Sequence, residues 1–291
     1  MNVNHFFDPR TYTLTYVVWD ETTLDSVIID PVLDYDPASS TYNYESLEKV
    51  DSFIKGKKLK THLILETHAH ADHLTGAQEL KKRLPGSIIV IGKRISEVQE
   101  AFKVIYNLKE EFKTDGSQFD KVLAEGEEIS AGSIKVKSIQ TPGHTPACCT
   151  YLIEDMAFTG DALFMPDYGV GRCDFPKGSA EDLFDSVHEK LFKLPDSTKV
   201  YTAHDYMPND RPLRWESTIG EQKKSNIHLN ASTTKEEFVA FRTSRDKTLN
   251  APKLLLPSIE VNVDAGRLPK PEDNGVSYLK IPVTAAKANK N

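Results

Sequence analysis

Residues 67–73 read T-H-A-H-A-D-H and place three histidines and one aspartate directly after the apolar run L-I-L-E. A solvated face is usually built from lysine and glutamate, so this pattern favours metal binding over simple exposure. Potential ligands recur after other apolar runs, as His144 in T-P-G-H-T, Asp161 in F-T-G-D-A-L and His204 in T-A-H-D-Y. One buried histidine is more often a packed core residue, but several in the same context favour a shared site. Histidine and aspartate without cysteine favour Zn, Fe or Mn as the ion.

These groups need a scaffold that brings distant loops together, and the hydrophobic pattern predicts one. Short apolar runs rich in β-branched residues precede each ligand group and predict strands, while 3.6-residue periodicity between them predicts helices. The predicted strands are 13–19, 26–33, 59–67, 87–92, 134–140, 148–158 and 199–205. The predicted helices are 44–54, 74–84, 94–106, 180–192 and 233–242. Strands with helices between them predict two packed sheets whose outer faces are covered by helices.

Local signals refine this outline. Pro85-Gly86 should end the helix that follows the histidine cluster. Ser179 and Asp182 should cap the start of the predicted helix 180–192. Thr233 and Glu236 have the spacing of a capping box. The polar segment 107–121 predicts a loop or lid. The tail from about residue 251 is expected to be irregular, with its last residues, A-A-K-A-N-K-N, disordered.

Composition limits the classes of partner and the compartment. The chain has 291 residues, a formal net charge of −7 and no apolar run long enough to cross a bilayer, so we expect no nucleic-acid partner and no membrane span. The start, M-N-V-N-H-F-F-D-P-R, resembles neither a secretory signal nor a transit peptide, so we expect a cytoplasmic location. Cys148, Cys149 and Cys173 lack C-x-x-C spacing, which favours reduced thiols over a disulfide framework or a thiolate zinc site.

Taken together and in this order, H-A-H-A-D-H, T-P-G-H-T, G-D and A-H-D resemble the metallo-β-lactamase superfamily across nearly the whole chain. The resemblance implies an α+β fold, the four-layer αββα sandwich, with residues 1–250 as the catalytic domain and 251–291 as an extension packed on it. It also implies two groups of ligands joined by Asp161. His68, His70 and His144 form one group, and Asp72, His73 and His204 form the other.

Longer segments, including T-H-A-H-A-D-H-L-T-G, A-F-T-G-D-A-L, G-R-C-D-F and A-H-D-Y, are similar to persulfide dioxygenases, and 164–175 and 266–282 to the bacterial β-lactamase hydrolase-like group of these enzymes. That resemblance implies one Fe(II) per chain held by His68, His144 and Asp161. Two histidines, one carboxylate and open positions are the ligand set of a non-haem iron oxygenase. The implied reaction, which serves sulfide detoxification, converts glutathione persulfide and O2 to sulfite and glutathione.

By the same resemblance Arg172 binds a carboxylate of the tripeptide and Tyr206 donates a hydroxyl near its thiol end. A surface ion pair for Arg172 and a packed ring for Tyr206 are the ordinary alternatives. In the dioxygenase interpretation His70, Asp72, His73 and His204 orient the iron ligands by hydrogen bonding. A homodimer is possible.

Two other hypotheses remain open at this stage. His70, Asp72, His73 and His204 would also complete the second site of a dinuclear zinc thioester hydrolase of the glyoxalase II type, in which metal-bound water attacks the thioester. From a different class, the chain could be a non-catalytic sensor whose metal is only structural. A structural site is normally saturated by protein ligands, so open coordination positions would argue against the sensor.

Overall fold

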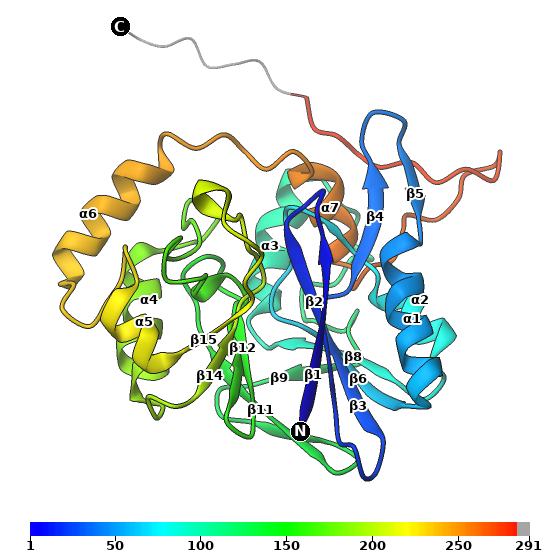
Figure 1. Cartoon of the computed structure of the whole chain (residues 1–291). Helices are drawn as coiled ribbons and strands as arrows, with labels where there is room; N and C mark the ends of the chain where they lie inside the picture. The colour runs from blue at the N-terminus through cyan, green and yellow to red at the C-terminus, as the bar shows by residue number, and fades with distance from the viewer. Residues whose placement is uncertain (284–291) are drawn as a thin grey trace, which may run out of the picture.

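A computed structural model, in which residues 1–283 are described, contains two six-stranded sheets packed face to face between two layers of helices (Figure 1). In the first sheet the strand order is β1-β2-β3-β6-β8-β9. These strands are β1 (Asn2–Asp8), β2 (Thr13–Trp19), β3 (Asp25–Ile29), β6 (Lys60–Glu66), β8 (Ile88–Gly92) and β9 (Lys121–Leu123). The pairs β1·β2 and β2·β3 are antiparallel, and the pairs from β3 to β9 are parallel. The unpredicted strand β1 is the edge strand of this sheet.

The second sheet runs β10-β11-β12-β13-β14-β15 and is antiparallel except between β13 and β14. Its strands are β10 (Glu128–Ala131), β11 (Ile134–Gln140), β12 (Cys149–Ile153), β13 (Met156–Phe158), β14 (Lys199–Tyr201) and β15 (Glu216–Thr218). The stretch 148–158, predicted as strand, forms the two paired strands β12 and β13, which Glu154 and Asp155 join in a turn.

A small third sheet, β5-β4-β7, corrects the prediction of one strand over 26–33. Its strands are β4 (Val32–Asp36), β5 (Thr41–Asn43) and β7 (Leu74–Thr75). Asp30 has a left-handed backbone (φ 50°) and Pro31 has no N–H to give to a ladder, so the chain leaves the first sheet there and enters the third. The bend leaves Asp30 at the end of β3.

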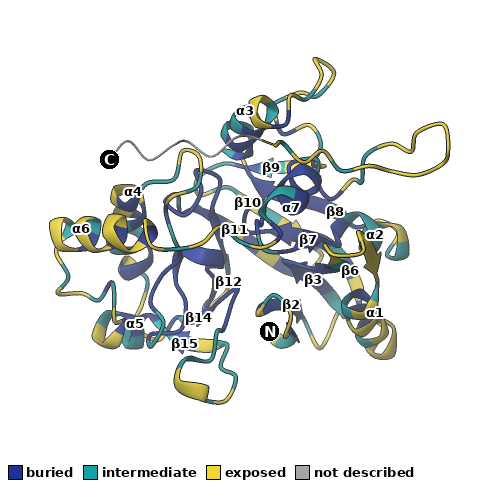
Figure 2. Ribbon diagram, turned by 90° about the horizontal axis from the view of Figure 1, so that it is seen from above, coloured by how far each residue is buried: buried dark blue, intermediate teal, exposed yellow. Residues whose placement is uncertain are grey.

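Alternation along β2 shows how the sheets share their cores. Leu14, Tyr16 and Val18 lie in the cluster between the two sheets, together with residues of the second sheet such as Tyr151 and Phe158. Successive side chains of a strand point to opposite faces. Accordingly Val17 and Trp19 belong to the cluster under the helices on the outer face of the first sheet. In Figure 2 most residues of the central strands are coloured as buried, whereas the helices expose their outer faces.

The helices form the two outer layers and confirm the predicted αββα arrangement. The apolar residues of α1, α2, α3 and α7 lie in the cluster on the first sheet, and those of α4, α5 and α6 in the cluster on the second. The helices are α1 (Glu45–Lys57), α2 (Ala77–Arg83), α3 (Ile95–Ile105), α4 (Ala180–Asp185), α5 (Ile219–Ser225), α6 (Lys235–Asp246) and α7 (Leu255–Asn262). Within the described residues, no helix is long and apolar enough to cross a membrane.

Three local predictions need correction. The helix expected from residue 74 begins at Ala77, because Leu74 and Thr75 pair with β4. The capping box of α6 is formed by Thr234 and Glu237, one residue beyond the predicted pair, since two threonines stand side by side and the helix begins after the second. The predicted helix 180–192 is α-helical only to Asp185 and continues as π-helical and 3-10 turns to Lys193.

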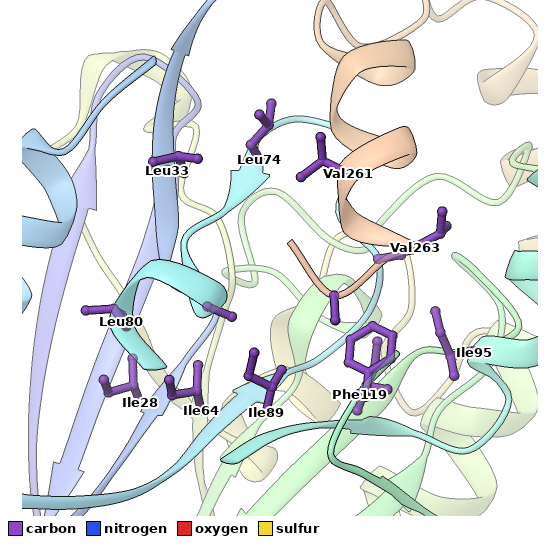
Figure 3. Close-up of a cluster of buried hydrophobic side chains, with 14 of the residues drawn as sticks. Ile28, Leu33, Ile64, Leu74, Leu80, Ile89, Ile95, Phe119, Val261 and Val263 are labelled. Carbon is purple, nitrogen blue, oxygen red and sulfur yellow. The ribbon is translucent and has the colours of Figure 1, made fainter. Parts of the chain in front are cut away.

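The tail beyond residue 251 is not wholly irregular, because it contains α7. Val261 is fully buried and lies in the same cluster as Ile89, Ile95 and Phe119 from the first sheet and its covering elements (Figure 3). Tertiary burial of these side chains overrides the low helix propensity around Pro257. The segment A-A-K-A-N-K-N, expected to be disordered, lies outside the described residues.

Candidate metal centre

The predicted ligands come together at one edge of the sandwich, where the strands end. The histidine cluster follows β6, His144 follows β11, Asp161 follows β13 and His204 follows β14. The loop 67–73 is irregular, yet all of its residues are buried except Asp72, which is partly buried. Gly160 permits this convergence, because it has φ 53° and a Cβ there would lie 2.7 Å from Thr67 Oγ1.

His68, His144 and Asp161 form a compact group of two imidazoles and one carboxylate. One ligand atom from each lies within 4.8 Å of the others. His144 Nε2 is 3.4 Å from Asp161 Oδ2, and the rings of His68 and His144 meet edge to face at 5.0 Å between centroids. The side chains of this group therefore converge on one point.

Hydrogen bonds on the far side of each ring set its orientation. His144 Nδ1 donates to the carbonyl oxygen of Arg172 at 2.6 Å. His68 Nδ1 lies 3.1 Å from Thr67 Oγ1, whose own proton is donated to Asp30 Oδ2 at 2.8 Å, so the hydroxyl accepts from His68. In the neutral form of each ring Nε2 is therefore the nitrogen without a proton, and both Nε2 atoms face inward, as in a metal ligand oriented through its second nitrogen.

Buried polar atoms without partners test whether this group fits a metal ion. Among the described residues, His68 Nε2 and Asp161 Oδ1 are buried and make no hydrogen bond. Leaving such atoms unsatisfied costs about 1–3 kcal/mol each, so they call for an explanation. A divalent cation satisfies both, and the donor set of imidazole and carboxylate suits Zn, Fe or Mn.

Burial also keeps His68 and His73 in the neutral form that binds metal. The pKa of His68 is far below its usual value, because its ring is fully buried and neighbouring histidines oppose a positive charge. Burial, followed by repulsion from His70, lowers the pKa of His73 to about 4. Neutral imidazole is the ligand, so neither ring has to lose a proton before binding at neutral pH.

The second predicted group is close to the first but arranged differently. His204 Nε2 lies 3.5 Å from Asp72 Oδ2 and 3.5 Å from Asp161 Oδ1. His70, Asp72 and His73 form a separate group within 4.8 Å. Burial raises the pKa of Asp72, but the nearby histidines, His204 first, outweigh it and lower that pKa to about 2. Among the described residues, no set of three potential ligand atoms lying within 4.8 Å of one another includes an atom of His204.

Asp30 is a residue of this centre that sequence reasoning missed. Its Oδ1 accepts from the N–H of Thr67 at 2.7 Å and lies 3.0 Å from His70 Nε2. Burial lowers the pKa of His70, but the charge and hydrogen bond of Asp30, together with the charges of Asp72 and Glu66, outweigh burial and raise that pKa to about 10. Glu66, also missed, is fully buried beside His70, and burial raises its pKa to about 8. The dipeptide Asp30-Pro31 after a strand was the available signal for the first; Glu66 gave none.

Arg172 and Tyr206 lie next to the group of His68, His144 and Asp161. The side chain of each already has partners within the chain. The Arg172 guanidinium pairs with Asp174, its Nη1 donates to the carbonyl oxygen of Asn250 at 2.7 Å, and only its backbone oxygen contacts His144. The partly buried ring of Tyr206 stacks on His204 at 5.5 Å and on Tyr168 at 4.6 Å. Burial raises the pKa of the Tyr206 phenol well above its usual value, so the hydroxyl keeps its proton.

A narrow recess opens beside His144 and is apolar on most sides. It is bounded by the loop of the histidine cluster, by α3, by α7 and by the segment after Arg172. Its lining residues are Ala69, Ala71, Val98, Phe102, His144, Thr145, Phe175, Pro176 and Ile259. The C-terminal helix therefore contributes one wall of the approach to the metal group.

Several known proteins have sequences similar to this one along most of its length. Glyoxylase B2 of Dictyostelium discoideum is 50% identical over 272 residues, which cover 93% of each chain. A beta-lactamase hydrolase-like protein of Xylella fastidiosa is 47% identical over 97% of this chain and 65% of that protein. The mitochondrial persulfide dioxygenase ETHE1 of Mus musculus is 36% identical over 86% of this chain and 82% of that protein.

The fold is also found among solved structures. The crystal structure of ETHE1 from Myxococcus xanthus matches with a TM-score of 0.73 and 30% identity, and the match covers 92% of this chain and all of that chain. The resemblance inferred from the motifs is thereby confirmed. Residues 8–204 match the family model described as the metallo-beta-lactamase superfamily, which is more than half of the chain, and the chain belongs to that superfamily.

Proposed function

We propose that this chain is a non-haem iron persulfide dioxygenase that converts glutathione persulfide, O2 and water to sulfite and glutathione. The observation that carries the proposal is the group of His68, His144 and Asp161, which leaves buried donor atoms unsatisfied on one side. Two histidines and one carboxylate leave positions for two further reactants on Fe(II). Similarity to relatives named persulfide dioxygenase supports the substrate class.

The residues of the chain would divide the work as follows. Bound iron would supply the redox chemistry between persulfide sulfur and oxygen, which zinc cannot do. Thr67 and the carbonyl oxygen of Arg172 hold the two imidazoles in place. The guanidinium of Arg172 would bind a substrate carboxylate after releasing Asp174. Tyr206, protonated at neutral pH, would donate its hydroxyl to the bound sulfur.

Burial around the centre supports oxygen chemistry as well. Phe175 meets the ring of His144 edge to face at 4.9 Å, and the recess beside it is apolar. Apolar walls limit the water that reaches the reactants and strengthen electrostatic interactions within the site. An apolar wall also suits O2, which is not charged.

A zinc hydrolase of the glyoxalase II type is the second candidate, and one observation favours it. His204 Nε2 lies 3.5 Å from both Asp72 Oδ2 and Asp161 Oδ1, so these three residues would hold a second ion beside the first. The name of the relative with 50% identity is also compatible with this activity. In this case a metal-bound water whose pKa is near 7 would attack a thioester.

Metal content and activity together separate the two candidates. We expect protein purified without oxygen to contain one iron per chain, and to consume O2 and release sulfite when glutathione persulfide is added. The His144→Ala variant, measured in parallel, should lose both the metal and the activity. Two zinc ions per chain with turnover of S-lactoylglutathione, and no sulfite from iron-loaded protein, would replace the proposal with the hydrolase.

A further inference from the structure

One peptide group connects the predicted ligand His144 to a buried carboxylate on α6. The carbonyl oxygen of Arg172 accepts the Nδ1 proton of His144 at 2.6 Å. The N–H of the same peptide unit, which belongs to Cys173, donates to Asp246 Oδ2 at 2.8 Å. The chain of contacts therefore runs from the Asp246 carboxylate through a single peptide plane to the imidazole.

Asp246 is not an ordinary surface acid. Its side chain is 6% exposed and forms an ion pair with Arg242, which is 4% exposed, at 2.5 Å between Nη2 and Oδ1. Arg242 Nη1 also lies 3.4 Å from the carbonyl oxygen of Val170. The pair thus contacts the segment 170–173 at two points: Arg242 donates to the carbonyl oxygen of Val170, and Asp246 accepts from the N–H of Cys173. These contacts hold the segment against α6.

Stability alone does not explain this arrangement. Asp246 is the last residue of α6, where the helix dipole disfavours a negative charge. Desolvation of a buried ion pair costs several kcal/mol per ion, and well-packed apolar residues often replace such a pair without loss of stability. What the pair provides here, and apolar residues would not, is a charged acceptor for one particular N–H.

We propose that Asp246 is a positioning residue for the metal ligand His144 and acts through the Arg172–Cys173 peptide group. A carboxylate that accepts from the N–H polarises the peptide and makes its carbonyl oxygen a stronger acceptor for the Nδ1 proton. The imidazole is then fixed in orientation, and its Nε2 becomes a better electron donor, as when a carboxylate contacts a ligand histidine directly. This inference rests on the proposed role of His144 as a ligand, but not on which metal or reaction follows.

The test measures metal affinity rather than turnover. Apoprotein is titrated with Co²⁺ in competition with a chromophoric chelator, and the absorption spectrum of bound Co²⁺ is recorded. Asp246→Ala removes the acceptor, whereas Asp246→Asn keeps an acceptor oxygen without its charge. Asp185→Asn is the matched control, because it breaks an exposed ion pair between Asp185 on α4 and Lys235, the first residue of α6.

We expect Asp246→Ala to raise the Co²⁺ dissociation constant by about 10- to 100-fold, and Asp246→Asn by a smaller factor, with a shifted spectrum. The control should stay within about twofold, the scatter of surface changes. If a single variant unfolds, the double variant Arg242→Met with Asp246→Asn replaces it, because it removes both buried charges and leaves neither unpaired. It should bind Co²⁺ more weakly than wild type. Folded Asp246 variants with wild-type affinity and spectrum would overturn the inference.

The same titration distinguishes this failure from failure of the proposed function. If wild-type protein binds Co²⁺ and His144→Ala does not, His144 is a ligand and the inference stands or falls on the Asp246 variants. Absence of sulfite production with iron-loaded wild-type protein would then reject the dioxygenase alone. If His144→Ala binds Co²⁺ as tightly as wild type, both proposals fail.

Discussion

Arg172 and Asp174 form a two-pronged ion pair in which Nε donates to Oδ1 at 2.6 Å and Nη2 to Oδ2 at 2.7 Å. The guanidinium that would bind a substrate carboxylate is therefore already bound to a carboxylate of the chain. Because only one carboxylate can use this face of the guanidinium at a time, Asp174 competes with the substrate.

The competition predicts a lower KM when Asp174 is replaced. Partly exposed ion pairs contribute up to about 1 kcal/mol, so Asp174→Asn should lower the KM for glutathione persulfide by about two- to fivefold with kcat nearly unchanged. Steady-state oxygen uptake at varied persulfide concentration measures both constants. Glu97→Asn, which breaks the similar pair with Arg94, is the control. A raised KM would mean that Asp174 instead orients Arg172 for binding.

Substitution of the two aspartates near the metal group should have unequal effects. Asp161→Asn removes a proposed iron ligand, so we expect loss of most of the iron and at least about a 100-fold fall in activity. Replacing a residue that only hydrogen-bonds to a metal ligand already lowers metal affinity or activity roughly 10- to 100-fold. Asp72→Asn should retain one iron per chain. Metal quantitation on both variants checks this. Equal loss of metal from both would indicate two coupled ions and favour the hydrolase.

The C-terminal helix should contribute to stability through Val261, which is fully buried in the cluster on the first sheet (Figure 3). Val261→Ala replaces the two methyl groups on Cβ by hydrogen atoms, so we expect a loss of about 2 kcal/mol in the free energy of unfolding. Urea unfolding followed by circular dichroism measures it. Ile227→Ala, at a side chain that is 59% exposed, should change stability by less than about 0.5 kcal/mol. Similar values for the two would show that α7 is not anchored by Val261.

His228 should make stability depend on pH below neutrality. Burial, followed by the charges of Arg242 and Arg245, lowers its pKa from 6.5 to about 4 in the folded protein. Between these two values the unfolded chain binds more protons than the folded one, so the free energy of unfolding falls as pH drops from about 6.5 to 4. The contribution of neutral His228 to the free energy of unfolding is fully present above about pH 6.5 and is lost below about pH 4.

The variant His228→Gln should lose this dependence, so the stability gap between it and wild type should shrink as pH falls from 7.5 through 6.5 to 5. Urea unfolding at these three pH values measures the gap. Ile227→Ala carries no ionisable change and should show a constant offset from wild type. A gap for His228→Gln that does not vary with pH would contradict the lowered pKa.

Much of the architecture was predictable because it depends on local patterns. Apolar runs ending at the histidine cluster, Asp161 and His204 predicted strands with polar residues at their ends, and the structure places those ends at one edge. The helical periodicity of Leu47, Val50 and Ile54 likewise predicted α1. Where prediction failed, at the bend of Asp30 and the start of α2, pairing with a distant strand decided the local structure.

By itself the sequence determined the ligand types, their order and the superfamily, because these are carried by short motifs whose chemistry depends on residue identity and spacing. Only the tertiary structure decided that Asp174 occupies Arg172, that Asp30 lies against His70, and that Asp246 contacts the peptide group behind His144. Asp30 and Asp246 are separated from their partners by tens of residues or more. No periodicity records such contacts, since they arise when burial brings distant polar groups together and each must then find a hydrogen-bond partner.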